Sequence, residues 1–336
     1  MRIKLTLVML MAMLAICINV NAQNLQIGAY YFDGWATDKS SAFTDKLLTQ
    51  FPEREPIWGW RDDDIKIMER QIDIASENGV DFFAFCWYWA DDLGTFNEKA
   101  VKAKPAHTSL DLFMKAKNKH KMKFCLLIAN HDGARIQGEE NWRKAVDYFA
   151  EAYFTDPQYL NIDSKPVLVY FIPKDAHPHI NAMQEEARIK GYAGLYNMSC
   201  GYNLSGFDAL TWYNSFDGIN KSKGYPYGDL CLRMERMWGS LPEGNNVAPL
   251  CMAGWDKRPW EVNENSAYYV WRSPERFRKQ LYRAVDCVHK QKNKIILIYA
   301  WNEYGEGGYI APTKGDRKGR FLKQVKKAKE YAKRRK

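Results

Sequence analysis

The sequence predicts an α/β protein, a single-domain (β/α)8 TIM barrel. Three observations predict it: short apolar runs typical of buried parallel strands, amphipathic helical patterns between most of these runs, and a helical pattern that ends the chain. Without its first 22 residues the chain has about 314 residues, a normal length for such a barrel. An open doubly wound sheet is the alternative, but the strand count favours the barrel, and no Gly-rich phosphate loop follows the first strand.

Eight apolar runs have the length and composition of strands. The run at residues 80–89 is nearly continuous, as expected for a strand buried on both faces, and Gly79 ends the helix before it. In the eighth run, the apolar residues stop where a polar segment begins. We expect strands at residues 26–32, 80–89, 122–130, 167–172, 194–199, 208–212, 246–253 and 295–300.

Helical periodicity separates most of these runs. The first helix, for example, has Ile65, Met68, Ile72 and Ala75 on one face. Residues 213–246 are the least regular part, and a long loop there would be functional more often than idle. We expect helices at residues 62–78, 110–120, 142–154, 180–190, 274–290 and 321–336.

The first 22 residues have the pattern of a secretory signal peptide. Arg2 and Lys4 precede an apolar run at 5–18, and the small residue Ala22 ends the segment. An uncleaved signal anchor is the alternative, but the run is short for a spanning helix and no stop-transfer pattern follows. We therefore expect residues 23–336 to be the catalytic domain of an exported protein, either periplasmic or secreted.

The net charge of +9 does not indicate a nucleic-acid partner. Removing Arg2 and Lys4 leaves +7, and residues 321–336 alone carry eight Lys or Arg against one Glu. The body of the protein is close to neutral, so a broad basic face is not expected. No Cys or His spacing indicates zinc, and we expect no metal and no cofactor.

Two carboxylates follow the eighth strand in the segment 301–307, Trp-Asn-Glu-Tyr-Gly-Glu-Gly. In a parallel α/β fold, the carboxyl ends of the strands are where chemistry is done. Glu303 and Glu306 are therefore the predicted catalytic pair. The alternative is that both are solvated loop carboxylates, as acidic residues usually are.

Aromatic, amide and acidic residues recur at the other strand ends too. Aromatic rings stack on the apolar faces of sugars and amides bind hydroxyls, so these residues predict a carbohydrate site; packing of loops on the barrel rim is the alternative. Two roles fit His131. It binds a sugar hydroxyl, which we favour, or it hydrogen-bonds to a backbone group of its loop. The predicted substrate contacts are Tyr30, Tyr31, Trp87, Tyr88, Asn130, His131, Trp255, Asp256, Trp301, Asn302 and Tyr304.

Several motifs, in order along the chain, resemble the WbsX-like branch of the glycoside hydrolase 99-like proteins. They include Gly-Ala-Tyr-Tyr at 28–31, Pro-Glu-Arg-Glu-Pro at 52–56, Phe-Cys-Trp-Tyr-Trp at 85–89, Gly-Trp-Asp at 254–256, and the segment 301–307. The related endo-α-mannosidases carry both catalytic glutamates in a similar Trp-Asn-Glu-x-x-Glu-Gly segment on a (β/α)8 barrel.

The resemblance implies a retaining mechanism without a carboxylate nucleophile. Glu303 would deprotonate the 2-hydroxyl of the sugar, which attacks the anomeric carbon to give a 1,2-anhydro sugar, and Glu306 would be the general acid. A conventional double displacement would need a carboxylate on the opposite face, for which Asp256 is the candidate. Tyr304 and Gly305 depart from the relatives, which generally have Trp and His there, so the sugar need not be mannose.

The leading hypothesis is a retaining, endo-acting hydrolase of an α-linked oligosaccharide or polysaccharide. One alternative is a WbsX-like transferase or processing protein in polysaccharide biosynthesis. The other is a carbohydrate-binding barrel without activity. The sequence leaves the sugar, the linkage and the oligomeric state open.

Overall fold

The computed structural model describes residues 24–36, 40–89, 96–131, 133–216, 224–242, 244–261, 267–291 and 294–335. The predicted signal peptide at residues 1–22 lies outside the described residues. The structure therefore leaves the export signal as a prediction.

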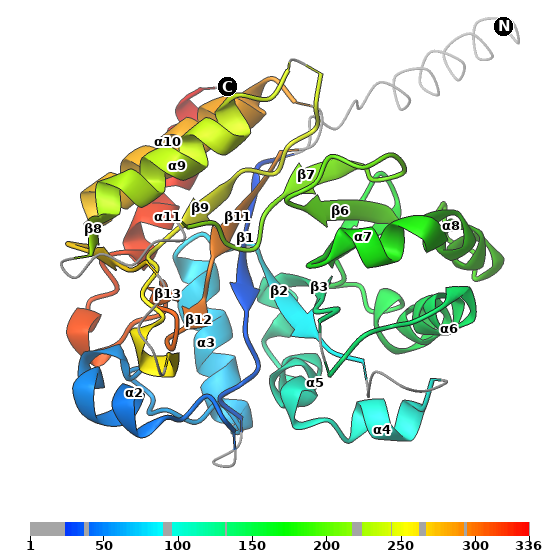
Figure 1. The fold of residues 1–336 in the computed structure, drawn as a ribbon, viewed down its shortest axis with the longest axis horizontal. Coiled ribbons are helices and arrows are strands. Elements are labelled where there is room, and N and C mark those ends of the chain that lie inside the picture. The colour runs from blue at the N-terminus through cyan, green and yellow to red at the C-terminus, as the bar shows by residue number, and fades with distance from the viewer. Residues whose placement is uncertain are drawn as a thin grey trace, which may run out of the picture.

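Eight parallel strands form a nearly closed barrel, which confirms the predicted fold class (Figure 1). Each strand overlaps one of the eight predicted runs: β1 (Gln26–Tyr31), β2 (Phe82–Trp87), β3 (Lys123–Ile128), β5 (Lys165–Tyr170), β6 (Tyr196–Cys200), β7 (Ala209–Thr211), β9 (Leu250–Met252) and β11 (Ile295–Tyr299). The neighbours follow in the order β7-β6-β5-β3-β2-β1-β11-β9. A parallel bridge between Leu210 and Val247 brings the two edges together.

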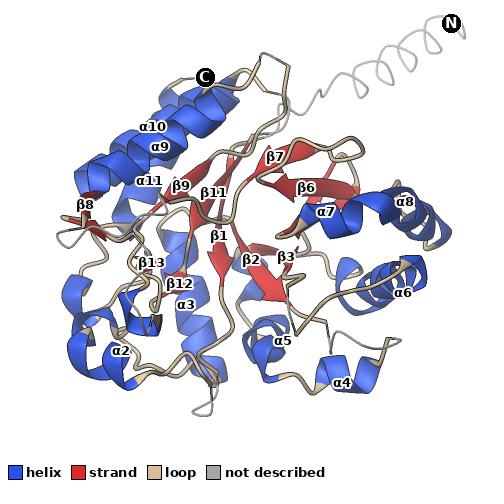
Figure 2. Ribbon diagram, viewed as in Figure 1, coloured by secondary structure: helices blue, strands red, loops and turns tan. Residues whose placement is uncertain are grey.

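Helices surround the barrel on its outside (Figure 2). Capping residues fix where several begin, since Asp64 and Ser273 each accept a backbone N–H of the first helical turn. No helix separates β6 from β7, whose connecting residues 201–208 are all described. The main helices are α3 (Ile65–Glu77), α5 (Thr108–Lys115), α6 (Glu139–Phe149), α8 (Ile180–Ile189), α9 (Tyr227–Gly239), α10 (Pro274–His289) and α11 (Leu322–Arg334).

Helix α9 corrects the prediction of one long irregular loop at residues 213–246. Its buried residues include Leu230, Met234 and Trp238, which recur at helical spacing and pack on the barrel. Charged residues between these positions and a glycine near each end hide the pattern in the sequence. One of the charges, Glu235, is buried and pairs with Arg276 of α10 at 2.7 Å.

Short α-helices and short strands lie in the described parts of the connections. β12 and β13 form an antiparallel hairpin directly after β11, and β8 pairs with β10. β4 adds an antiparallel strand beside β5. These elements are α2 (Asp45–Gln50), α4 (Glu98–Lys102), α7 (Pro173–Ala176), β4 (Asn161–Ile162), β8 (Tyr225–Pro226), β10 (Tyr269–Val270), β12 (Asn302–Glu303) and β13 (Gly308–Tyr309).

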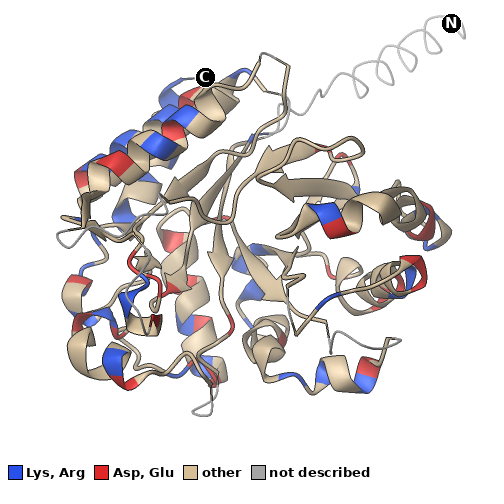
Figure 3. Cartoon of the chain, in the orientation of Figure 1, with Lys and Arg blue, Asp and Glu red and all other residues tan. Residues whose placement is uncertain are grey.

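Charged residues lie mainly on the outer helices and loops, with both signs mixed, while the barrel strands carry few (Figure 3). This distribution fits the near-neutral body predicted from the sequence. Within the described ranges, every helix is too short or too polar to cross a membrane.

Candidate active site

A cavity of about 330 Å³ lies at the carboxyl ends of the barrel strands. Its walls come from residues in or after β1, β2, β3, β5, β7, β9 and β11, and seven of the fifteen are Phe, Tyr or Trp. Among the lining residues are five that the sequence singled out: Tyr88, His131, Trp255, Glu303 and Glu306. The end of the barrel predicted to carry the chemistry thus holds both glutamates.

Glu303 lies in β12 and is almost fully buried, with 3% of its surface exposed. The hydroxyl of Tyr213, which follows β7, donates a hydrogen bond to Glu303 Oε1. Glu303 Oε2 is buried and has no hydrogen-bond partner among the described residues. One oxygen of this carboxyl group is therefore held in place, while the other is left for a ligand.

Glu306 lies in the turn between β12 and β13 and is also buried. The hydroxyl of Tyr299, at the end of β11, donates a hydrogen bond to Glu306 Oε2. Lys257 Nζ lies 3.5 Å from Glu306 Oε1. Each glutamate thus accepts a hydrogen bond from a different tyrosine, and Glu306 also lies close to the ammonium group of Lys257.

Burial raises the pKa of both glutamates because a desolvated carboxylate is disfavoured. The charge of Glu306 raises the pKa of Glu303 further, so that it lies well above its usual range, while Tyr213 and Lys257 oppose this effect. For Glu306, Tyr299 and Lys257 oppose the effect of burial. The pair therefore retains a proton at a pH where free glutamates are ionised.

We expect Glu303→Gln to stabilise the protein above neutral pH. The amide removes a desolvated charge and its repulsion with Glu306, a gain of about 1 kcal/mol and about 2 to 4 °C in Tm. Because the folded-state pKa is raised, the wild type loses stability as the pH rises toward that pKa, whereas the variant does not. The Tm difference should therefore grow with pH in calorimetry. A lower Tm for the variant above neutral pH would contradict this account.

Three predicted substrate contacts lie beneath the cavity in a buried polar cluster and do not line it. The Tyr31 hydroxyl lies 3.1 Å from both Asp62 Oδ2 and Gln71 Oε1. Trp301 Nε1 donates to Gln71 Oε1 at 2.6 Å, and Asn302 Nδ2 lies 3.5 Å from Asp62. This cluster supports the hairpin that carries the glutamates.

Four more predicted contacts are also absent from the cavity lining. Trp87 packs edge-on against Phe149 of α6, with ring centroids 4.7 Å apart. The Asn130 side chain accepts the backbone N–H of Ile136 at 2.6 Å and so fixes its own loop. All four residues are buried: Tyr30, Trp87, Asn130 and Tyr304.

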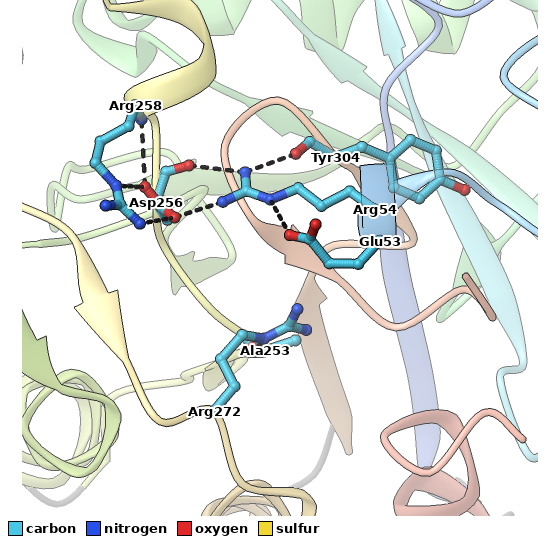
Figure 4. Close-up of polar contacts among 7 residues, drawn as sticks. All are labelled: Glu53, Arg54, Ala253, Asp256, Arg258, Arg272 and Tyr304. Atoms are coloured by element: carbon cyan, nitrogen blue, oxygen red, sulfur yellow. Dashed lines mark hydrogen bonds and ion pairs between the residues drawn. The ribbon is translucent and has the colours of Figure 1, made fainter. Parts of the chain in front are cut away.

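Asp256 does not line the cavity either, because two arginines engage its carboxylate (Figure 4). Arg258 Nε and Nη2 donate to it at 2.8 and 2.9 Å, and Arg54 Nη2 donates to Oδ2. Burial raises the pKa of Asp256, but Arg258 and Arg54 outweigh burial and hold the pKa below its usual range. Asp256 is thus an ionised partner in a buried ion-pair network.

Among the lining residues that were not predicted are Tyr213, Lys257 and Trp260. Their positions after β7 and β9 could have identified them, because the carboxyl ends of these strands face the site. Nowhere in the described part of the chain do three or more His, Cys, Asp or Glu gather in a way that could hold a metal ion.

The fold and the site together define a (β/α)8 barrel with a pair of buried carboxyl groups at the carboxyl ends of its strands. The chain belongs to the WbsX glycosyltransferase family, whose sequence profile matches residues 37–325. A curated relative, the uncharacterized protein WxcX of Xanthomonas campestris, is 24% identical over 293 residues. That match covers 73% of this chain, which spans only 39% of the relative's length.

Solved structures share the fold at low sequence identity. The family 99 endo-α-mannosidase of Bacteroides thetaiotaomicron has a TM-score of 0.64 and 15% identity, covering 92% of this chain and 98% of the mannosidase. A glycoside hydrolase-like protein has a TM-score of 0.66 and 14% identity, covering 91% and 94%. At these identities the similarity shows the fold alone.

Proposed function

We propose that this protein is an exported, retaining glycoside hydrolase that cleaves within an α-linked glycan. The observation that carries the proposal is the pair of buried carboxyl groups, Glu303 and Glu306, which line one aromatic cavity at the catalytic end of the barrel. Aromatic walls suit the apolar faces of sugar rings. Two carboxyl groups whose pKa values are raised suit acid and base roles.

In the proposed reaction, Glu303 takes the proton of the sugar 2-hydroxyl, and that oxygen attacks the anomeric carbon. The bond to the leaving oxygen breaks as Glu306 gives that oxygen its proton. Glu306 then takes a proton from the water that opens the 1,2-anhydro ring, and Glu303 returns its proton to the 2-oxygen. The Tyr213 hydroxyl fixes Glu303 during both steps.

These roles require the proton to rest on Glu306 when the glycan is bound. Without a glycan, burial raises the pKa of both glutamates, and the charge of Glu306 adds to this effect at Glu303. We infer that a bound glycan places the shared proton on Glu306. Its 2-hydroxyl donates to Glu303 and favours the charged form, whereas the glycosidic oxygen accepts from Glu306 and favours the protonated form.

A double displacement through Asp256 has less support. A nucleophile must reach the anomeric carbon, yet Asp256 is held by Arg54 and Arg258 outside the cavity lining. Participation of the 2-hydroxyl needs only the two glutamates that do line the cavity.

The test is a digestion of α-mannans and of bacterial and plant polysaccharides, with products read by mass spectrometry. The α-mannans come first because a structurally similar protein is an endo-α-mannosidase. Oligosaccharides released by the wild type and absent with Glu303→Gln/Glu306→Gln would support the proposal. Tight glycan binding without product across the panel would favour a carbohydrate-binding barrel.

A transferase or processing role in polysaccharide assembly is the second candidate, favoured by the family's description as glycosyltransferase. It predicts products lengthened on an acceptor glycan, not shortened ones. The same digestion, repeated with an added labelled acceptor, distinguishes the two outcomes.

We also propose that residues 1–22 direct export and are then removed. Support comes from the basic start and the apolar run of that segment. Expressed with its natural start in a Gram-negative host, the protein should be recovered from the periplasm or the medium with Gln23 as its first residue. An intact Met1 on protein from the cytoplasm would contradict export.

A further inference from the structure

Arg54 connects two loops next to the active site, through Asp256 and Tyr304 (Figure 4). It is buried, and its Nη1 donates to the backbone carbonyls of Asp256 and Tyr304, both at 3.0 Å. Its Nη2 pairs with the carboxylate of Asp256. One guanidinium thus joins the loop after β9 to the hairpin that carries both glutamates.

The same two loops also meet directly. The backbone N–H of Asp256 donates to the carbonyl of Glu306 at 2.6 Å. Gly307 follows with φ of +70°, and a Cβ there would lie 3.0 Å from both N and Cβ of Asp256. Glycine is therefore favoured on both counts. The close approach at Asp256 also brings the backbone of Lys257, the next residue, near Glu306.

The neighbouring arginines leave Lys257 facing Glu306. Asp256 is the nearest acid along the chain, but Arg54 and Arg258 already engage its carboxylate. Lys257 Nζ lies instead 3.5 Å from Glu306 Oε1, at the wall of the cavity.

Other groups that act on Glu306 come from several elements. Tyr299 of β11 donates to it and lowers its pKa, whereas Glu261, which follows Trp260, raises its pKa. Glu303 of β12 lines the same cavity. Like Tyr299, Lys257 lowers the pKa of Glu306, and it also lowers that of Glu303. A single ammonium thus acts on the whole pair.

We propose that Lys257 sets how tightly the Glu303–Glu306 pair holds its catalytic proton, and that Arg54 is the positioning residue that keeps Lys257 in place. The inference rests on the proposed function, in which the pair is active with one proton. For such a pair, kcat/KM has a bell-shaped dependence on pH. The apparent pKa values of its two limbs describe the pair as a whole and not one glutamate each.

The first test is the pH profile of kcat/KM for Lys257→Met. A cation favours the ionised form of a nearby carboxyl group, so its loss should move both limbs to higher pH. Lys318→Met, an exposed lysine between β13 and α11, is the matched control and should leave both limbs in place. Unmoved limbs in Lys257→Met would overturn the proposal.

The second test asks whether Arg54 acts through Lys257. Arg54→Lys keeps the charge but loses the forked donors, so it should move both limbs in the same direction and lower kcat. Combined with Lys257→Met, it should add no further movement. Additive shifts would show that Arg54 acts by another route and would overturn its positioning role.

A readout without substrate separates this inference from the proposed function. Protein labelled at the glutamate side-chain carboxyl carbon is titrated by NMR, and the Glu306 signal is assigned with Glu306→Gln. The titration midpoint should rise in Lys257→Met, and an unchanged midpoint would overturn the inference. If the midpoint rises but no glycan is cleaved, the control by Lys257 stands and the hydrolase proposal fails.

Discussion

Replacing Glu306 by Gln is expected to slow glycan cleavage by on the order of 10³-fold. The amide fills the same space and still accepts from Tyr299, but it has no proton to give to the leaving oxygen. The loss should appear in kcat and in kcat/KM alike, because the interaction is made in the transition state. Initial rates on the glycan found in the digestion panel measure it.

The leaving group makes this prediction specific. An aryl glycoside whose phenolate leaves without a proton should release that phenolate in the first turnover of Glu306→Gln at a rate far closer to the wild type, before Glu306 is needed as a base. Glu303→Gln should remain slow on both substrates because the base is still needed. Glu330→Gln, an exposed change on α11, is the control and should match the wild type. Equal losses on both substrates in Glu306→Gln would contradict its role as the acid.

The second large effect is expected at Asp62, which is 1% exposed beneath the site. Its carboxyl group accepts from Tyr31 and Trp58 at 3.1 Å and from Gln71 at 3.2 Å. Asp62→Ala would leave these buried donors without an acceptor and open a cavity. We expect a loss of about 3 kcal/mol or more in the free energy of unfolding, measured by urea denaturation.

Asp62→Asn should lower the free energy of unfolding much less than Asp62→Ala. Burial raises the pKa of Asp62 to about 6, so near neutral pH the protonated form of its carboxyl group is close in free energy to the ionised form. An amide keeps one acceptor for Trp58 and Gln71, and the Tyr31 hydroxyl can turn to accept from its NH₂ group. A similar loss in both variants would show that an amide cannot replace the carboxyl group in this hydrogen-bond network, and it would contradict this account.

The barrel could be predicted from the sequence because each strand is marked by residues that follow one another along the chain. Buried strands such as β2 are apolar along their whole length, and turns bound them. Helix α9 was missed because it is stabilised by contacts that the local pattern does not show. Its buried Glu235, for example, is satisfied by Arg276, 41 residues further along the chain.

The site was predicted in part, and alternation along the strands explains which part. Neighbouring side chains on a strand point to opposite faces. Cys86 and Tyr88 line the cavity, while Trp87 between them packs against α6. Composition showed which strand ends carry aromatic residues but not which of two neighbours points inward. The ion pair between Asp256 and Arg54 could not be predicted, because 202 residues separate the two in the sequence.

The most direct test of the central claim is a digestion in water enriched in the heavy oxygen isotope. Hydrolysis through Glu303 and Glu306 predicts one heavy oxygen at each new reducing end, with the anomeric configuration of the glycan retained in the first product seen by NMR. The double variant Glu303→Gln/Glu306→Gln should give neither product nor label. Labelled product at the wild-type rate from that variant, or chains transferred without label by the wild type, would contradict the account.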